Sequence, residues 1–131
     1  MDTIISHLAA TRLMSRNKSL IPNGFFANIV PINNNGDCVA ISTDGVGTKV
    51  LVAQKLKKYD TIGIDCVAMN VNDILCVGAL PISMVDYIAM ERRNDDLLKE
   101  LAVGLSAGAR EAQIEIVGGE TAIVPRNSKW F

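Results

Sequence analysis

The segment from Asp60 to Val77 constrains the fold of this chain more than any other part of it. Its aliphatic residues gather on one broad face when they are placed at 100° per residue. Four polar residues interrupt the segment: Asp65, Asn70, Asn72 and Asp73. Carboxylates are costly inside a membrane, so the segment is not expected to span one. It predicts an amphipathic helix that begins at an Asp60 N-cap and runs to about Val77.

Helices and strands alternate along the rest of the chain. Helical spacing of apolar residues, an Asn94 cap and short apolar runs distinguish the two kinds of element. The predicted helices cover 2–15, about 50–58 and the residues after Asn94, the predicted strands cover 38–42, 82–90 and 114–117, and a turn is predicted at 33–37. This alternation predicts one α/β or α+β domain spanning residues 1–131.

Composition narrows the class of protein. The chain has 131 residues, and its 13 Lys and Arg against 14 Asp and Glu give a net charge of −1, which excludes a strongly basic nucleic-acid binder. Charged residues make up 21% and hydrophobic residues 49%, which excludes intrinsic disorder. The mean hydropathy of +0.24 is high for a monomer, and an interface that takes up apolar surface would explain it.

The cysteines and the N-terminal sequence predict a cytoplasmic protein. Cys38, Cys66 and Cys76 are odd in number and lack CxxC spacing, so neither a disulfide framework nor a zinc site is expected. We expect buried free thiols in a reducing compartment. The first residues, MDTIISHLAATR, lack the basic segment and apolar stretch of a signal peptide.

A glycine-bearing loop, DGVGT at 44–48, follows a predicted strand and precedes a predicted helix. Backbone N–H groups near Gly45 and Gly47 would suit phosphate oxygens. The helix N-terminus at Thr48 and the ammonium group of Lys49 would do the same, and Asp44 would hold a divalent cation. The alternative is a tight turn in which Asp44 caps the helix, since TDGVGTK is not the P-loop pattern.

Two other groups of residues combine carboxylates with loops or helix ends. Asn72 and Asp73 could lie beside a bound Mg–nucleotide, or they could cap a turn or face solvent. The sequence Gly118-Gly119-Glu120-Thr121 follows a predicted strand and could admit a ligand or another chain, or it could form a simple turn. Together with the 44–48 loop, these groups point to one Mg–phosphate site. No Ser/His/Asp or Cys/His set is available for nucleophilic catalysis, because His7 lies far from these loops in sequence.

The chain carries four segments in a recognisable order: STDGVGTK at 42–49, DTIGIDCVAMNVNDILCVGALP at 60–81, MVDYIA at 84–89 and VGGETA at 117–122. Over roughly residues 24–125, they resemble the N-terminal domain of the phosphoribosylformylglycinamidine cyclo-ligase (AIR synthetase) family. Selenophosphate synthetase, thiamine-monophosphate kinase and other families share this architecture, but TIGIDCVAMNVNDIL is closer to AIR synthetase.

The resemblance implies a fold, an assembly and a reaction. The fold would be a mixed sheet with flanking helices, and the sheets of two subunits would pair into an intersubunit barrel in a homodimer. The family uses ATP and Mg²⁺ to activate the formyl amide oxygen of formylglycinamidine ribonucleotide, a small-molecule substrate. An internal nitrogen then displaces phosphate, which gives aminoimidazole ribonucleotide, ADP and phosphate in purine synthesis.

The resemblance also implies which residues bind ATP. Asp44 and Asp73 would be the metal ligands beside the ATP phosphates. The other residues expected at the phosphates are Gly45, Gly47, Thr48, Lys49, Asn72, Gly118, Gly119 and Glu120. The family pattern is expected to end at Pro125, before the sequence RNSKWF, and the segment at 11–28 is only a loose match to the family's usual N-terminal motif.

The resemblance covers only the ATP-binding part of the family enzyme. The C-terminal substrate domain is expected to be absent, so the chain would be inactive alone, and a separate chain could supply that domain. One alternative is a non-catalytic dimerising module that binds nucleotide. Another is a kinase-like relative that acts on a different small substrate.

Overall fold

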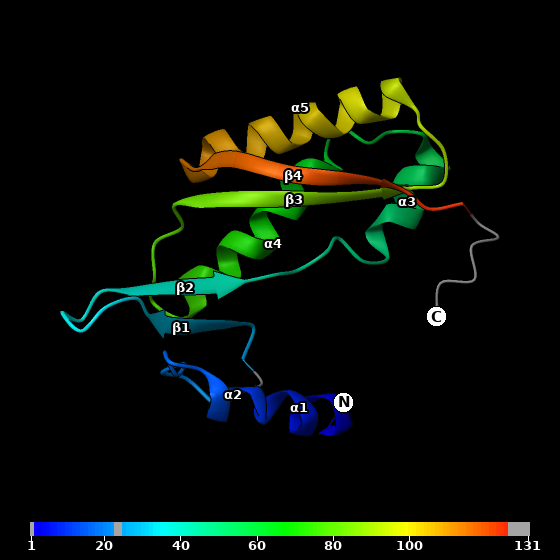
Figure 1. Cartoon of the computed structure of the whole chain (residues 1–131). Helices are drawn as coiled ribbons and strands as arrows, with labels where there is room; N and C mark the ends of the chain where they lie inside the picture. The colour runs from blue at the N-terminus through cyan, green and yellow to red at the C-terminus, as the bar shows by residue number, and fades with distance from the viewer. Residues whose placement is uncertain (1, 23–24, 126–131) are drawn as a thin grey trace. The chain divides into compact units, whose positions relative to one another are not determined.

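A computed structural model of the chain describes residues 2–22 and 25–125 (Figure 1). The elements are α1 (Asp2–Ala9), α2 (Thr11–Met14), β1 (Ala27–Pro31), β2 (Cys38–Ser42), α3 (Lys49–Leu56), α4 (Ile62–Cys76), β3 (Ser83–Met90), α5 (Asp95–Ala112) and β4 (Glu115–Ile123). This mixture of helices and small sheets confirms the predicted fold class. The end of the chain after Pro125, RNSKWF, lies outside the described residues.

The chain divides into two compact units, each built from separated stretches of sequence. The hairpin unit comprises Met1–Asp44 and Asn70–Leu80, and the crossover unit comprises Gly45–Met69 and Pro81–Phe131. Helix α4 therefore contributes its first half to the crossover unit and its second half to the hairpin unit.

The hairpin unit is built on the antiparallel strands β1 and β2. Ala27 pairs with Ser42, and Pro31 pairs with Cys38. Asn33 closes the intervening turn, because its Oδ1 accepts hydrogen bonds from the N–H groups of Asn35 and Asp37 at 2.9 and 3.3 Å. The turn predicted at 33–37 and the strand predicted at 38–42 are thereby confirmed.

The helix predicted over 2–15 is interrupted. It forms α1 and α2, with Ala10 between them. Ala10 N–H bonds to the carbonyl oxygen of His7, three residues back instead of four. This tighter turn ends α1 and separates the two short helices.

The crossover unit contains the parallel strands β3 and β4, and α5 connects them (Figure 1). Parallel strands require a crossover connection of this kind. Ser83 pairs with Glu115 and Met90 with Ile123, with an irregularity between Met84 and Val85. Among the described residues the strands form two separate two-stranded sheets instead of one mixed sheet.

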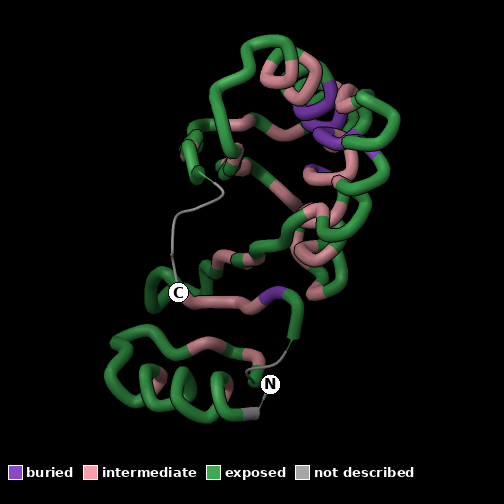
Figure 2. Tube along the Cα trace, turned by 90° about the vertical axis from the view of Figure 1, so that its right-hand side faces the viewer, coloured by how far each residue is buried: buried purple, intermediate pink, exposed green. Residues whose placement is uncertain are grey.

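Glycines bring the first half of α4 close to α5. A Cβ atom added at Gly63 would lie 2.6 Å from the carbonyl oxygen of Leu101, and one added at Gly108 would lie 3.0 Å from the Cβ of Val67. Non-bonded carbon atoms prefer separations of about 3.5–4.0 Å, so these positions have no room for a larger residue. Most buried residues gather on these helices (Figure 2), and Val67 is only 1% exposed.

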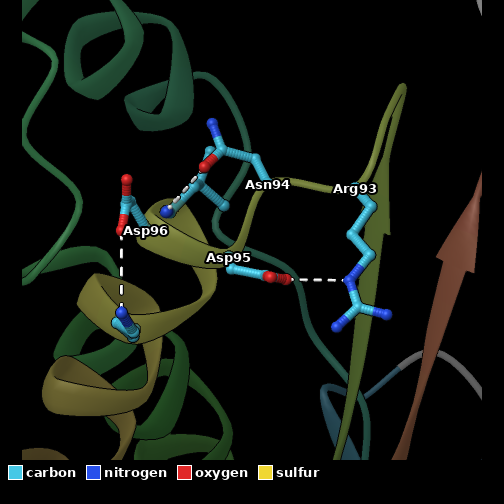
Figure 3. Close-up of polar contacts among 6 residues, drawn as sticks. Arg93, Asn94, Asp95 and Asp96 are labelled. Atoms are coloured by element: carbon cyan, nitrogen blue, oxygen red, sulfur yellow. Dashed lines mark hydrogen bonds and ion pairs between the residues drawn. The ribbon is translucent and has the colours of Figure 1, made fainter.

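The start of α5 is capped as the sequence predicts (Figure 3). Asn94 Oδ1 accepts a hydrogen bond from Leu97 N–H at 3.1 Å. Asp95 lies in the first turn and accepts a hydrogen bond from Arg93 Nε at 2.8 Å. A carboxylate in the first turn also interacts favourably with the positive end of the helix dipole.

Two local expectations are wrong. Asp60 does not begin α4, which starts at Ile62, and its carboxylate instead accepts a hydrogen bond from Lys58 Nζ at 2.9 Å. The three cysteines form no disulfide among the described residues, and the expectation that they are buried is wrong. Cys38 and Cys76 are exposed because they lie at the start of β2 and the end of α4, and Cys66 is half-buried. In the part of the chain that the structure describes, no helix is long and apolar enough to cross a membrane.

Candidate functional site

A hydrogen bond in the hairpin unit joins the end of β2 to the second half of α4. Ser42 Oγ donates to Asp73 Oδ2 at 3.0 Å. Asp73 is half-buried, and its second oxygen, Oδ1, has no hydrogen-bond partner among the described residues. One oxygen of this carboxylate is therefore held in place, while the other can bind a cation or a donor.

Asn70 holds the backbone of Asp44 with both ends of its side-chain amide. Asp44 N–H donates to Asn70 Oδ1 at 2.9 Å, and Asn70 Nδ2 donates to the Asp44 carbonyl oxygen at 3.3 Å. The sequence analysis assigned no role to Asn70 or to Ser42. Their spacing was the available signal, since Ser42 and Asp44 are two residues apart at the end of a predicted strand while Asn70 and Asp73 are three apart on a predicted helix.

The structure thus brings the two predicted metal ligands, Asp44 and Asp73, into one compact unit and fixes each through a neighbour. Carboxylates suit Mg²⁺, which is usually bound by one or two of them together with water and substrate phosphates. Among the described residues there is no group of three or more His, Cys, Asp or Glu that could hold a metal ion by itself. The contacts with Asn70 and Ser42 hold the backbone of Asp44 and the carboxylate of Asp73.

The loop at 44–48 leads into α3 in the crossover unit. Gly47 has a φ of 64°, which favours glycine and accords with the predicted turn. The N-cap of α3 is Thr48 instead of Asp44, and its side chain makes no capping hydrogen bond. Two of the first N–H groups of α3 already have backbone partners, because Val50 N–H donates to the Gly47 carbonyl oxygen at 3.3 Å and Leu51 N–H donates to the Thr48 carbonyl oxygen at 3.0 Å.

Lys49 forms an ion pair with Asp65 in the crossover unit. Lys49 Nζ lies 2.7 Å from Asp65 Oδ1, and the two side chains are 56% and 31% exposed. The pair holds the ammonium group at the start of α3. At this exposure such a pair contributes little to stability, about 0.2–1 kcal/mol.

The alternative that Gly118-Gly119-Glu120-Thr121 forms a simple turn is wrong. These residues lie inside β4, and the first three pair with Val85, Asp86 and Tyr87 of β3. A Cβ atom at Gly119 would overlap the Asp86 carboxylate and lie 2.6 Å from the Asp86 carbonyl oxygen. Parallel pairing with the eight-residue β3 extends the strand through both glycines, and Gly119 leaves room for Asp86.

Asn72 differs from its neighbours on α4. It is exposed, and it makes no hydrogen bond to another described residue. Its predicted role at the phosphates therefore has no support from contacts within the chain.

A small open pocket of about 200 Å³ lies apart from all the predicted site residues. It is lined by Lys57, Lys58, Asp60 and Glu100. Glu100 accepts a hydrogen bond from Tyr59 N–H at 2.7 Å. A hydrogen bond from Lys58 lowers the pKa of the Asp60 carboxyl, and the same contact raises the pKa of Lys58.

Comparison with known protein families shows which family the chain belongs to. The family described as AIR synthase related protein, N-terminal domain, matches residues 26–130. This chain belongs to that family. The expectation that the family pattern ends at Pro125 is wrong, because the family match continues to residue 130.

Similar family members are cyclo-ligases. The chain is 45% identical over its whole length to the phosphoribosylformylglycinamidine cyclo-ligase of Methanobrevibacter smithii, and the match covers 40% of that protein. It is 60% identical over 66% of its length to the cyclo-ligase of Pyrococcus horikoshii, covering 26% of it. It is 46% identical over 95% of its length to that of Thermoplasma acidophilum, covering 36%.

The chain spans 40% or less of the length of these relatives. The similarity to the M. smithii protein also includes the N-terminal segment at 11–28, which the motifs matched only loosely. The family match therefore covers both predicted metal ligands and the glycine loop between β2 and α3.

Proposed function

We propose that this chain is the ATP-binding and dimerising part of a phosphoribosylformylglycinamidine cyclo-ligase and is inactive alone. The complete reaction would convert formylglycinamidine ribonucleotide and ATP into aminoimidazole ribonucleotide, ADP and phosphate, in the cytoplasm. The observation that carries the proposal is that Asp44 and Asp73 are each held by a hydrogen-bonding neighbour, in a family whose relatives are named cyclo-ligases.

Bound Mg²⁺–ATP would supply the phosphoryl group that activates the formyl amide oxygen. Asp44 and Asp73 would hold Mg²⁺, and the Ser42 hydroxyl would fix the orientation of Asp73. Gly45, Gly47, Thr48 and Lys49 would bind phosphate oxygens through backbone N–H groups and an ammonium group. Asn72, Gly118, Gly119 and Glu120 complete the proposed ATP contacts. Positioning and charge neutralisation would account for most of the catalysis, as in other phosphoryl transfers.

Calorimetric titration with Mg²⁺–ATP tests the binding site. We expect the Asp73→Ala variant to bind at least about 10-fold more weakly than the wild type, because losing even an outer-shell partner of a metal costs that much. The matched control is Asp96→Ala, which removes a carboxylate that is 94% exposed on α5. Equal affinities of wild type and Asp73→Ala would show that the metal assignment is wrong.

The proposed homodimer rests on the exposed apolar residues of β3. Val85 and Tyr87 are 66% and 67% exposed and lie two residues apart on one face of the strand. A second copy that covers this face would remove both from water. We expect light scattering to give the mass of a dimer for the wild type and of a monomer for Tyr87→Glu. A monomeric wild type would contradict the proposal.

Reconstitution tests the proposed division of labour. We expect the chain alone to produce no aminoimidazole ribonucleotide, and a mixture with a separate chain that carries the remaining cyclo-ligase domain to produce it when ATP is present. An inactive mixture in which the chain still dimerises and binds Mg²⁺–ATP would instead identify a binding module. Turnover of a different small substrate would identify a kinase-like relative.

A further inference from the structure

We propose that Asn70 is a positioning residue that holds Asp44 in the orientation needed to bind Mg²⁺. The inference rests on the proposed function, in which Asp44 is a metal ligand. It goes beyond that function because Asn70 itself would touch neither the metal nor ATP.

Two hydrogen bonds connect the side-chain amide of Asn70 with the backbone of Asp44. One amide group accepts from the Asp44 N–H at 2.9 Å and donates to the Asp44 carbonyl oxygen at 3.3 Å. A side-chain amide can accept and donate in this way with one planar group at any pH near neutrality, because it does not titrate. It satisfies both backbone groups of Asp44, as a neighbouring strand would, at a position where β2 has already ended.

Two contacts join residues at the end of β2 to residues of α4 with a similar spacing. Ser42 is the last residue of β2, and Asp44 lies two residues beyond it. Asn70 and Asp73 are three residues apart on α4, which makes them neighbours about 5–6 Å apart on its surface. The Ser42–Asp73 and Asp44–Asn70 contacts therefore connect the same stretch of chain to the same face of α4 at two points.

The two contacts together restrain the orientation of the chain at Asp44 more than either contact does alone. The Ser42–Asp73 hydrogen bond joins the last residue of β2 to α4. The Asn70 amide adds a second attachment at Asp44, where the backbone leaves the strand for the glycine loop. Groups that orient metal ligands typically change metal affinity about 10–100-fold when they are removed.

Titrations of the full chain with Mg²⁺–ATP and with metal-free ATP test the inference. We expect Asn70→Ala to weaken Mg²⁺–ATP binding about 10-fold while the affinity for metal-free ATP changes less than about 2-fold. Alanine is a better helix former than asparagine, so melting of α4 would not explain the loss. Asn70→Gln keeps the amide on a longer side chain and is expected to recover part of the metal-dependent affinity.

Asn94→Ala is the matched control. It also removes an asparagine that accepts a backbone N–H, but this residue caps α5 instead of contacting Asp44 (Figure 3). We expect it to lower the melting temperature without changing the ratio of the two ATP affinities.

The outcomes separate the inference from the function on which it rests. A wild type that does not bind Mg²⁺–ATP would overturn the proposed function together with the role of Asn70. Wild-type binding with unchanged affinity in Asn70→Ala would overturn the inference alone. Equal weakening of both ATP forms, without recovery in Asn70→Gln, would also overturn it, since a purely structural role predicts that result.

Discussion

In its first half, α4 packs against α5 through glycines, whereas in its second half it is joined to β2 and the following loop by side-chain hydrogen bonds. Gly63 and Val67 lie in the close-packed half, where an added methyl group would overlap backbone or side-chain atoms. Asn70 and Asp73 lie in the hydrogen-bonded half, where both side chains are only half-buried.

The two halves of α4 should therefore differ in how strongly a substitution changes the stability of the chain. Close packing makes the first half intolerant of any increase in volume. Hydrogen bonds of half-buried groups contribute less, about 0.5–1.5 kcal/mol each, so the second half can change without unfolding the chain. Substitutions in the two halves should therefore separate loss of folding from loss of nucleotide binding.

The largest expected effect is on stability, from Gly63→Ala. The added methyl group would meet backbone atoms of α5, which cannot move as a flexible side chain would. We expect a loss of about 3 kcal/mol in the free energy of unfolding, measured by urea denaturation. Gly118→Ala is the control, because an added Cβ there meets nothing within 4 Å. Equal stabilities of the two variants would contradict the close approach of the helices.

Ser42→Ala should mainly weaken Mg²⁺–ATP binding and should change the stability of the chain little. It removes the hydroxyl that orients Asp73, so we expect Mg²⁺–ATP affinity to fall about 10-fold. Stability should change by only about 1 kcal/mol. Ser106→Ala, an exposed hydroxyl on α5, is the matched control and should bind like the wild type. A large loss of stability without loss of affinity would show that Ser42 serves the fold instead.

Asn94→Ala should destabilise the chain less than Gly63→Ala does. Loss of an N-cap typically costs about 1 kcal/mol, and α5 would begin with its Leu97 N–H uncapped. The measurement is again urea denaturation, with Asn94→Ser as a variant that keeps a capping oxygen. An unchanged midpoint in Asn94→Ala would mean that the cap contributes nothing measurable.

The ion pair of Lys49 with Asp65 should contribute less to the free energy of unfolding than the Asn94 cap does. A double-mutant cycle with Lys49→Met and Asp65→Asn is expected to give a coupling energy below about 1 kcal/mol, because both side chains are partly exposed. High salt should reduce it further. A coupling of several kcal/mol would place this pair among the structural contacts of the crossover unit.

The smallest effect concerns the pH dependence of stability at Asp60. Lys58 lowers the folded-state pKa of this carboxyl below its ordinary value, so the contact stabilises the folded chain above the unfolded-state pKa, near 3.9. That contribution is lost as the pH falls through the folded-state pKa. Thermal melts from pH 6 to pH 2 should show wild type and Asp60→Asn converging at low pH. Parallel curves would contradict the assignment.

Local chemistry made much of the fold predictable. The Asn33 turn, the Asn94 cap and β2 depend on neighbouring residues, and each lies where the sequence places it. Long-range contacts were harder. Tandem glycines usually mark a turn, but pairing with β3 carries β4 through Gly118 and Gly119.

In the candidate site, too, local chemistry was easier to predict than long-range contacts. Asp44, Asp73 and the glycine loop could be proposed from residue type and family resemblance. Asn70 could not, because its role depends on which backbone group lies opposite it, and that is decided by the packing of α4. Asn72 was the asparagine predicted at the site, yet Asn70 is the residue that contacts Asp44.

The parallel pairing of β3 with β4 has a consequence for how the chain acquires its structure. The β1–β2 hairpin can close as soon as its turn forms, whereas β4 can reach β3 only after the residues of α5 between them have been ordered. Until then the edge of β3 that pairs with β4 is open to association with the wrong partner, in addition to the opposite edge, which stays unpaired in this two-stranded sheet of the described residues. The speed at which α5 forms therefore determines how long the first of these edges is exposed.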